Sequence, residues 1–396
     1  MPAFLTSSPG KVILFGEHAV VYGKVATAGS LGLRSTALIQ TRTDMTISAT
    51  LPDVQLDRAW SVADLPVQER WTEYPFPPPT MNADLLDQLE QIVNLRKQTN
   101  RSQAAIALLY LHAHLATKAV LEQGFDFSVR SSLPVGAGLG SSASYSVCVA
   151  TALLQINGFL TPEMDNATKR DLVNQWAFQA EKVIHGNPSG IDNTVSTFGG
   201  AVAFKKGQIE PLPEFQSLRF LLTNTRVPRE TQVQVANVRK RRDRFPNIID
   251  PVLDSIDSIS VSCKELFSHH NLTRAELLAQ FGDLIDINHG LLIGLGVSHP
   301  ALEKVREISS KLGLKSKLTG AGGGGCALTL IRDDVTAEVV EAIKVLLGAE
   351  GFQCFETSVG GPGAGVLPLK QNMPMAYFLD TDKEALDARA GWQYFA

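Results

Sequence analysis

A glycine-rich segment between a predicted strand and a predicted helix constrains this chain more than any other feature. Residues 133–143 read LPVGAGLGSSA; they follow a β-branched alternation over 125–133 and precede apolar residues 145–154. Glycines let the backbone turn tightly and bring N–H groups to one point, and the helix start adds its positive dipole end. The segment therefore predicts a polyphosphate site rather than a flexible Gly-Ser loop, with its two serines available to Mg²⁺ or a phosphate oxygen.

Other nucleotide motifs do not fit this chain. The loop at 133–143 carries Ser141 where GxGxxG needs its third glycine. Residues 319–326 match GxGxxG formally, but residues 327–331 are predicted to form a strand, whereas the dinucleotide motif leads into a helix. Both Gly-Lys pairs are followed by valine, which excludes a Walker A loop, and the HRD and DFG segments of protein kinases are absent.

Two polar constellations flank tight glycine turns elsewhere in the chain. Residues 8–11 (SPGK) and 16–23 (GEHAVVYG) interrupt an apolar N-terminal region, and residues 181–193 lead from a predicted helix end to Asp192. A lone Lys or His is usually a surface or packing residue, but clustering around glycine turns favours a site. Phosphoryl transfer needs carboxylates to hold Mg²⁺ and to orient the attacking hydroxyl. Local sequence alone leaves Asp192 equally compatible with such a role and with a helix cap or turn aspartate.

Length and composition limit the classes that remain. A chain of 396 residues exceeds the usual single core, so two domains are expected, with a boundary near residue 225. The net charge of −4 disfavours nucleic-acid binding. The four cysteines are far apart, so we expect reduced thiols rather than disulfides or structural zinc. The sequence shows neither a membrane-spanning segment nor a signal peptide.

Hydrophobic periodicity predicts alternating strands and helices. We expect two strands joined by a turn over residues 4–15, a strand over 38–49, and a buried helix over 104–122. A helix with a capping-type start is predicted over 166–185, and mostly helical structure over 229–289.

Three motifs in order resemble the superfamily of galactokinase, homoserine kinase, mevalonate kinase and phosphomevalonate kinase. They are residues 9–23, 134–143 and 317–326, so the resemblance spans nearly the whole chain. Within the superfamily, residues 16–21 and 181–193, with 222–225 and 228–229, look like animal mevalonate kinases.

The resemblance implies an α+β fold with two domains and the active site in the cleft between them. The expected domains are an N-terminal ATP-binding α/β domain over 1–225 and a smaller C-terminal α/β domain over 226–370. The tail, 371–396, departs from the relatives and receives no assignment.

The resemblance also implies an activity. A protein of this kind transfers the γ-phosphoryl group of ATP to the 5-hydroxyl of mevalonate with Mg²⁺, in isoprenoid and sterol biosynthesis. It implies a cytoplasmic homodimer, with peroxisomal association left open, that prenyl diphosphates inhibit in competition with ATP. A sibling kinase for phosphomevalonate, galactose or homoserine, or an inactive nucleotide-binding sensor, are the alternatives.

Residue roles follow from the resemblance, position by position. Asp192 and Lys11 would be catalytic, Ser142 and Glu181 would hold Mg²⁺, and His18 and Thr231 would contact mevalonate. Asp53 stands where relatives have an asparagine that contacts the nucleotide. The expected nucleotide-binding residues are Lys11, Ser131, Gly136, Ala137, Gly138, Leu139, Gly140, Ser141 and Ser142.

Overall fold

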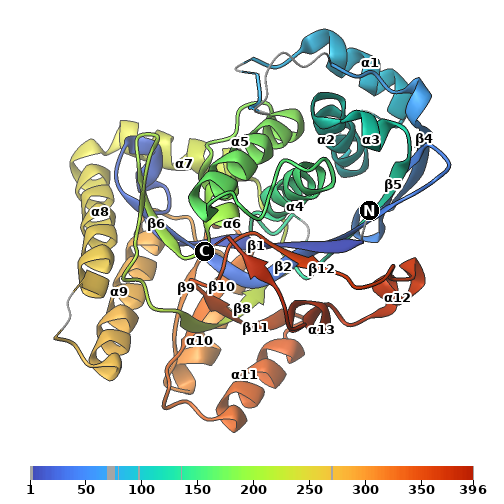
Figure 1. Cartoon of the computed structure of the whole chain (residues 1–396). Helices are drawn as coiled ribbons and strands as arrows, with labels where there is room; N and C mark the ends of the chain where they lie inside the picture. Colours follow the sequence, from blue (N-terminus) through green and yellow to red (C-terminus); the bar gives the residue numbers. More distant parts are fainter. Residues whose placement is uncertain are drawn as a thin grey trace.

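The computed structural model describes residues 3–68, 76–78, 80–96, 99–134, 136–268 and 271–395 (Figure 1). Its strands are β1 (Phe4–Phe15), β2 (Ala26–Thr41), β3 (Thr46–Leu51), β4 (Leu56–Ser61), β5 (Gly124–Ser131), β6 (Ala201–Lys205), β7 (Gln208–Pro211), β8 (Leu218–Asn224), β9 (Lys315–Leu318), β10 (Cys326–Ile331), β11 (Gln353–Val359), β12 (Gly365–Pro368) and β13 (Gln393–Tyr394). Its helices are α1 (Ala83–Val93), α2 (Asn100–Leu115), α3 (Lys118–Leu121), α4 (Ser141–Ile156), α5 (Asn166–His185), α6 (Ile191–Phe198), α7 (Thr231–Arg244), α8 (Pro246–Ser268), α9 (Arg274–Gly294), α10 (Pro300–Lys311), α11 (Ala337–Ala349), α12 (Met375–Asp380) and α13 (Lys383–Asp387).

One mixed sheet runs through the described part of the molecule. Its main path is β13-β12-β1-β2-β11-β8-β10-β9, and β3 to β7 branch from it. The β3–β5 pair is parallel, and the other pairs are antiparallel. Helices α2, α4 and α5 lie on one side of the long strands β1 and β2, while α10 and α11 lie beside β8 to β11 (Figure 1). This arrangement confirms the expected α+β class.

The buried side chains form separate clusters at the two ends of the sheet. One cluster packs α1, α2, α4 and α5 on β1 to β5, and includes Trp176 and Phe127. Another joins α8, α10 and α11 to β8 and β10. A third, with Phe15, Phe220 and Phe281, connects strands of both halves. The strands β11 and β12 return to β2 and β1, so the division at 225/226 stays a prediction.

Local signals placed several elements correctly. The helix predicted over 166–185 is α5, where the Asp165 side chain accepts from the Thr168 N–H at 2.9 Å as a cap. The strand after the second glycine-rich segment is β10. Residues 229–289 form α7, α8 and most of α9, as the sequence predicted.

Three predicted elements were wrong in their extent, in each case because contacts with distant residues decided where the strand or helix ends. Residues 4–15 form one strand rather than two, because β1 pairs with β2 from Phe4 to Phe15. A register shift between Pro9 and Gly10 accommodates the proline within the strand. The strand predicted over 38–49 is two strands, β2 and β3, with a turn between them. The predicted helix over 104–122 breaks after Leu115, where the Asn157 side chain accepts from the Thr117 N–H at 2.7 Å.

Residues 371–395, left without assignment from the sequence, form α12, α13 and β13. Phe378 and Leu386 are buried in a cluster with Leu5 and Leu38, and β13 extends the sheet beside β12. Among the described helices, none is long and apolar enough to cross a membrane.

Candidate active site

Loop one, residues 133–140, turns the chain from β5 into α4. Gly136, Gly138 and Gly140 have φ angles of 74°, 71° and 71°, which other residues adopt only with strain. Gly140 is the N-cap of α4 and provides no side-chain cap to the helix. The first N–H groups of α4 are therefore free of a capping side chain, as an anion site at a helix start requires.

Lys11 and Asp192 meet beside loop one. The Lys11 N–H donates to the Leu139 carbonyl at 2.8 Å, which fixes β1 against the loop. The Lys11 Nζ lies 2.9 Å from Asp192 Oδ1, near the start of α6. A Cβ at Gly140 would stand 3.3 Å from the Lys11 backbone nitrogen, which is a tight contact, and the φ of 71° favours glycine at this position. The structure thus brings together the two residues predicted to be catalytic.

Glu181 lies behind the serines of α4. Its carboxylate is 3% exposed and accepts from the Ser146 hydroxyl at 3.2 Å. Burial, with the nearby Asp192 charge, raises the pKa of Glu181 to about 7, while the Ser146 and Ser142 hydroxyls oppose that rise. The Asp192 carboxylate thus adds negative charge close to Glu181, which a cation between the two groups would offset.

A cavity of about 390 Å³ collects most of the predicted site residues. Its wall includes side chains with large apolar surfaces, such as Leu51, Val54 and Tyr145, as well as glycines of loop one. The predicted residues on its wall are Asp53, Ser131, Gly136, Gly138, Gly140, Ser141, Ser142, Asp192 and Thr231.

Other predicted residues lie away from the wall of this cavity. The side chains of Ala137 and Leu139 are buried in the cluster that joins the two halves. His18 is buried, and its Nε2 lies 2.9 Å from the Ala321 carbonyl oxygen. Burial lowers the pKa of His18, so the ring is neutral near pH 7. His18 therefore connects the first motif to the second glycine-rich segment.

Two residues at the site were not predicted. Arg229 lies on the cavity wall, and a Cβ at Gly138 would stand 1.0 Å from its Nη2 atom. His185 places Nε2 2.9 Å from the Ser142 hydroxyl oxygen. Arg229 and His185 belong to segments on which the family resemblance rests. Their positions in the sequence, however, do not predict contact with the other site residues.

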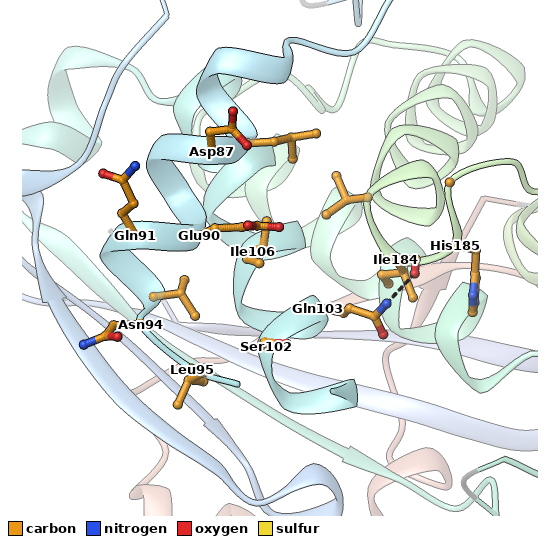
Figure 2. Close-up of a pocket in the computed structure, with 14 residues that line it drawn as sticks. Asp87, Glu90, Gln91, Asn94, Leu95, Ser102, Gln103, Ile106, Ile184 and His185 are labelled. Carbon is orange, nitrogen blue, oxygen red and sulfur yellow. Dashed lines mark hydrogen bonds between the residues drawn. The ribbon is translucent and has the colours of Figure 1, made fainter. Parts of the chain in front are cut away.

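A second cavity, of about 780 Å³, adjoins the first between α1, α2 and α5 (Figure 2). Gln103, Ile184 and His185 line both cavities. The Gln103 amide donates to the Ile184 carbonyl at 2.7 Å and ties α2 to the end of α5. Apolar side chains, among them Ile106, line part of this second cavity, and Asp87 and Glu90 give it an acidic side.

The fold and the site define a GHMP kinase. Residues 102–200 match the model of the GHMP kinases N-terminal domain, and residues 271–344 match that of the GHMP kinases C-terminal domain. The chain belongs to the mevalonate kinase family: it is 43% identical to the mevalonate kinase of Bos taurus, over 91% of this chain and 94% of that one. It is 42% identical to the mevalonate kinase of Homo sapiens, with the same coverage.

Solved structures agree with this assignment. The crystal structure of the Methanococcus jannaschii mevalonate kinase is 25% identical and superposes with a TM-score of 0.68, over 90% of this chain and 98% of that one. The L. major mevalonate kinase, solved in complex with R-mevalonate, is 24% identical with a TM-score of 0.65, over 90% and 96% of the two chains, and shows the same fold.

Proposed function

We propose that this protein transfers the γ-phosphoryl group of ATP to the 5-hydroxyl of (R)-mevalonate, giving 5-phosphomevalonate and ADP. The observation that carries the proposal is the Lys11–Asp192 pair, 2.9 Å apart, next to loop one in a chain of the mevalonate kinase family. The cavity beside this pair is lined by loop one, where the nucleotide would bind, and by Asp192, near which the small alcohol would bind.

The geometry supports a division of tasks among the side chains. The N–H groups of loop one and of the start of α4 would hold the phosphates. The hydroxyl oxygen forms a bond to the γ-phosphorus as the bond from this phosphorus to the β-phosphate oxygen breaks. Asp192 orients the hydroxyl, and it either accepts the hydroxyl proton early or stabilises the positive charge that develops on the hydroxyl group. Lys11 would stabilise the negative charge of the transferred group beside Asp192.

The residues near Glu181 fit a magnesium ion. The Ser142 hydroxyl and the Glu181 carboxylate are oxygen donors of the kind Mg²⁺ prefers, and the charge of the nearby Asp192 carboxylate would favour a cation there. Within the described residues no group of three His, Cys, Asp or Glu side chains is arranged for a metal, so phosphate oxygens and waters would complete the shell. When bound, Mg²⁺ neutralises phosphate charge.

We assign the mevalonate contacts to His18 and Thr231. Thr231 begins α7 and lies on the cavity wall with Asp192. His18 is held by its hydrogen bond to Ala321, so it would act from a fixed position beside the second glycine-rich segment.

A substrate panel tests the proposal. Coupled ADP release with mevalonate, phosphomevalonate, galactose and homoserine distinguishes the preferred activity from that of a sibling kinase. We expect turnover with mevalonate alone. Turnover with another alcohol would replace the substrate, and ATP binding without turnover on any of the four would identify a nucleotide-binding sensor.

We also propose inhibition by prenyl diphosphates. A diphosphate would occupy the N–H groups of loop one in place of ATP, and the apolar side chains of the adjoining cavity would receive a prenyl tail (Figure 2). Inhibition by farnesyl diphosphate should be competitive with ATP. A pattern competitive with mevalonate and indifferent to ATP would reject the shared site.

A cytoplasmic homodimer completes the proposal. The helices α8 and α9 expose Val261, Ile287 and Ile293, and apolar side chains of this kind support contact with a second copy. Light scattering at micromolar concentration should give twice the chain mass of 42.8 kDa. Imaging of a tagged protein would test the location.

A further inference from the structure

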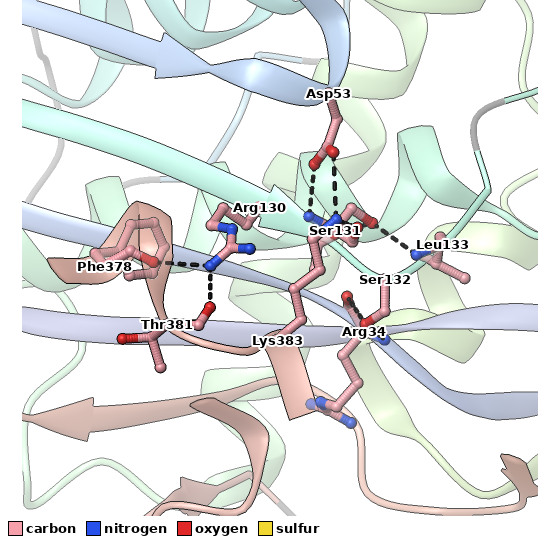
Figure 3. A network of polar contacts seen from close by, with 10 residues as sticks. Arg34, Asp53, Arg130, Ser131, Ser132, Leu133, Phe378, Thr381 and Lys383 are labelled. Atoms are coloured by element: carbon pink, nitrogen blue, oxygen red, sulfur yellow. Dashed lines mark hydrogen bonds and ion pairs between the residues drawn. The ribbon is translucent and has the colours of Figure 1, made fainter. Parts of the chain in front are cut away.

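The C-terminal segment, residues 371–395, is fixed beside the cavity of about 390 Å³ in which the nucleotide is proposed to bind. Phe378 of α12 is fully buried, and the Arg130 guanidinium of β5 donates to the Phe378 carbonyl at 3.0 Å and to the Thr381 carbonyl (Figure 3). Leu386 of α13 is also fully buried. These contacts hold the link between α12 and α13 against the end of β5, where loop one begins.

The far end of the segment is held as well. The Phe395 N–H donates to the Ala364 carbonyl at 3.0 Å. The Phe395 ring is buried in the cluster that packs α1, α2, α4 and α5 on β1 to β5. The Arg34 guanidinium lies 5.2 Å from the centre of the Tyr394 ring, a cation–π contact. These contacts on both sides of α13 fix its backbone, and therefore the position from which Lys383 extends.

Lys383, the first residue of α13, reaches the wall of the cavity. Its Nζ lies 3.3 Å from Asp53 Oδ1 and donates to the Ser131 carbonyl (Figure 3). The other oxygen of Asp53 accepts from the Ser131 N–H at 2.8 Å. Lys383, Asp53 and Ser131 therefore form a closed ring of polar contacts, in which Asp53 and Ser131 line the cavity.

The charges of Lys383 and Asp53 indicate what this ring of contacts does. Asp53 places a carboxylate on the wall of a cavity proposed to receive a polyanion, and an unpaired carboxylate there would repel the ligand and turn freely. Lys383 cancels that charge and holds both Asp53 and Ser131. The Ser131 hydroxyl oxygen also accepts a hydrogen bond from the Leu133 N–H at 3.2 Å. The position of Ser131 therefore affects the position of Leu133, the first residue of loop one.

We infer that Lys383 is a positioning residue of the nucleotide pocket, supplied by the C-terminal segment to fix Asp53 and Ser131. The inference rests on the proposed nucleotide site and adds to it a residue from outside the two predicted domains. The side chains of Lys383 and Asp53 are 32% and 33% exposed, so solvent weakens the pair and the effect on ATP affinity is moderate.

The test is a titration of each variant with ATP, because equilibrium binding does not depend on turnover. Lys383→Met should raise the Kd and the KM for ATP about fivefold, with kcat and the KM for mevalonate within about twofold of the wild type. Lys383→Arg should restore most of the affinity. Lys370→Met is the matched control, because Lys370 is an exposed lysine of the same region with no polar contact to a described residue.

A double-mutant cycle separates positioning from a general structural effect. If Lys383 acts through Asp53, Lys383→Met should change ATP affinity less than twofold in the Asp53→Asn background. An unchanged Kd in Lys383→Met, or an equal loss in both backgrounds, would overturn the inference. So would a loss of affinity that follows a fall in thermal midpoint and that Lys383→Arg fails to restore.

The outcome is readable apart from the proposed function. A wild-type protein that binds ATP but leaves mevalonate unphosphorylated would reject the activity, and the titrations would still report on Lys383. A wild-type protein that phosphorylates mevalonate, with Lys383→Met indistinguishable from it, would reject the inference alone.

Discussion

The two glycine-rich loops look alike in sequence but serve opposite purposes in the structure. At Gly136 of loop one, an added Cβ would meet no atom of the described residues within 4 Å. At Gly322 of loop two, residues 319–325, an added Cβ would stand 2.0 Å from the Val297 carbonyl oxygen. Both glycines have a φ of 74°, so the difference lies in the surroundings. At this position loop one leaves space for a ligand, whereas loop two is packed against protein.

Arg229 lies between the two loops and shows how they are related. A Cβ at Gly138 of loop one or at Gly320 of loop two would collide with its guanidinium. Its Nη1 donates to the Thr319 carbonyl at 3.5 Å. Loop two therefore supports a charged side chain that faces loop one, and the glycines of both loops make room for it.

The largest effect is expected on the chemical side of loop one. Asp192→Asn keeps the shape of the side chain but removes the charge beside Lys11 and the attacking hydroxyl, so kcat should fall by about 10² to 10⁴ with little change in ATP affinity. Steady-state kinetics with mevalonate and a separate ATP titration measure both. Near-normal turnover would remove Asp192 from the reaction.

Arg229→Ala tests the connection between the loops. Loss of a guanidinium that faces loop one should lower kcat/KM for ATP by about 10², because a preorganised positive charge near the phosphates is removed. Arg226→Ala is a suitable control, since Arg226 is an exposed arginine three residues earlier. A similar loss in both variants would mean that net charge, not the position of Arg229, matters.

Two alanine substitutions break the comparison directly. Gly322→Ala should destabilise the protein by about 2 kcal/mol or more, because the methyl group meets a carbonyl oxygen in addition to the cost of a positive φ. Gly136→Ala bears the same φ cost of about 1 kcal/mol and its methyl group meets no atom of a described residue within 4 Å, so it should mainly raise the KM for ATP. Thermal midpoints and ATP kinetics of both variants give the answer. Equal destabilisation of the two would contradict the difference in packing.

The smallest effect concerns the metal ion proposed to bind near Ser142 and Glu181. Glu181→Gln and Ser142→Ala should each raise the Mg²⁺ concentration for half-maximal rate by about tenfold. Ser141→Ala is the neighbouring control and should alter the KM for ATP without altering the Mg²⁺ requirement. A Mg²⁺ titration at saturating ATP measures this, and unchanged values for both variants would place the ion elsewhere.

The site shows which features were accessible from sequence. Loop one was predicted because its glycines, the strand before it and the helix after it lie within a few residues of one another. The same reasoning excluded loop two as a dinucleotide motif, since β10 follows it as a strand. In contrast, the single strand β1 was missed, because Pro9 and Gly10 are locally turn residues and only pairing with β2 keeps them extended.

The sequence by itself determined the family, the order of the motifs, the glycine-rich turn of loop one and the capped helix α5, because turns, caps and periodicity depend on neighbouring residues. The tertiary structure decided which charges meet. Lys11 pairs with Asp192, Arg229 lies between the loops, and Lys383 reaches Asp53 across 330 positions of the chain. No local pattern encodes such contacts, since they arise only when the sheet and the packed helices bring distant backbones within the reach of a side chain.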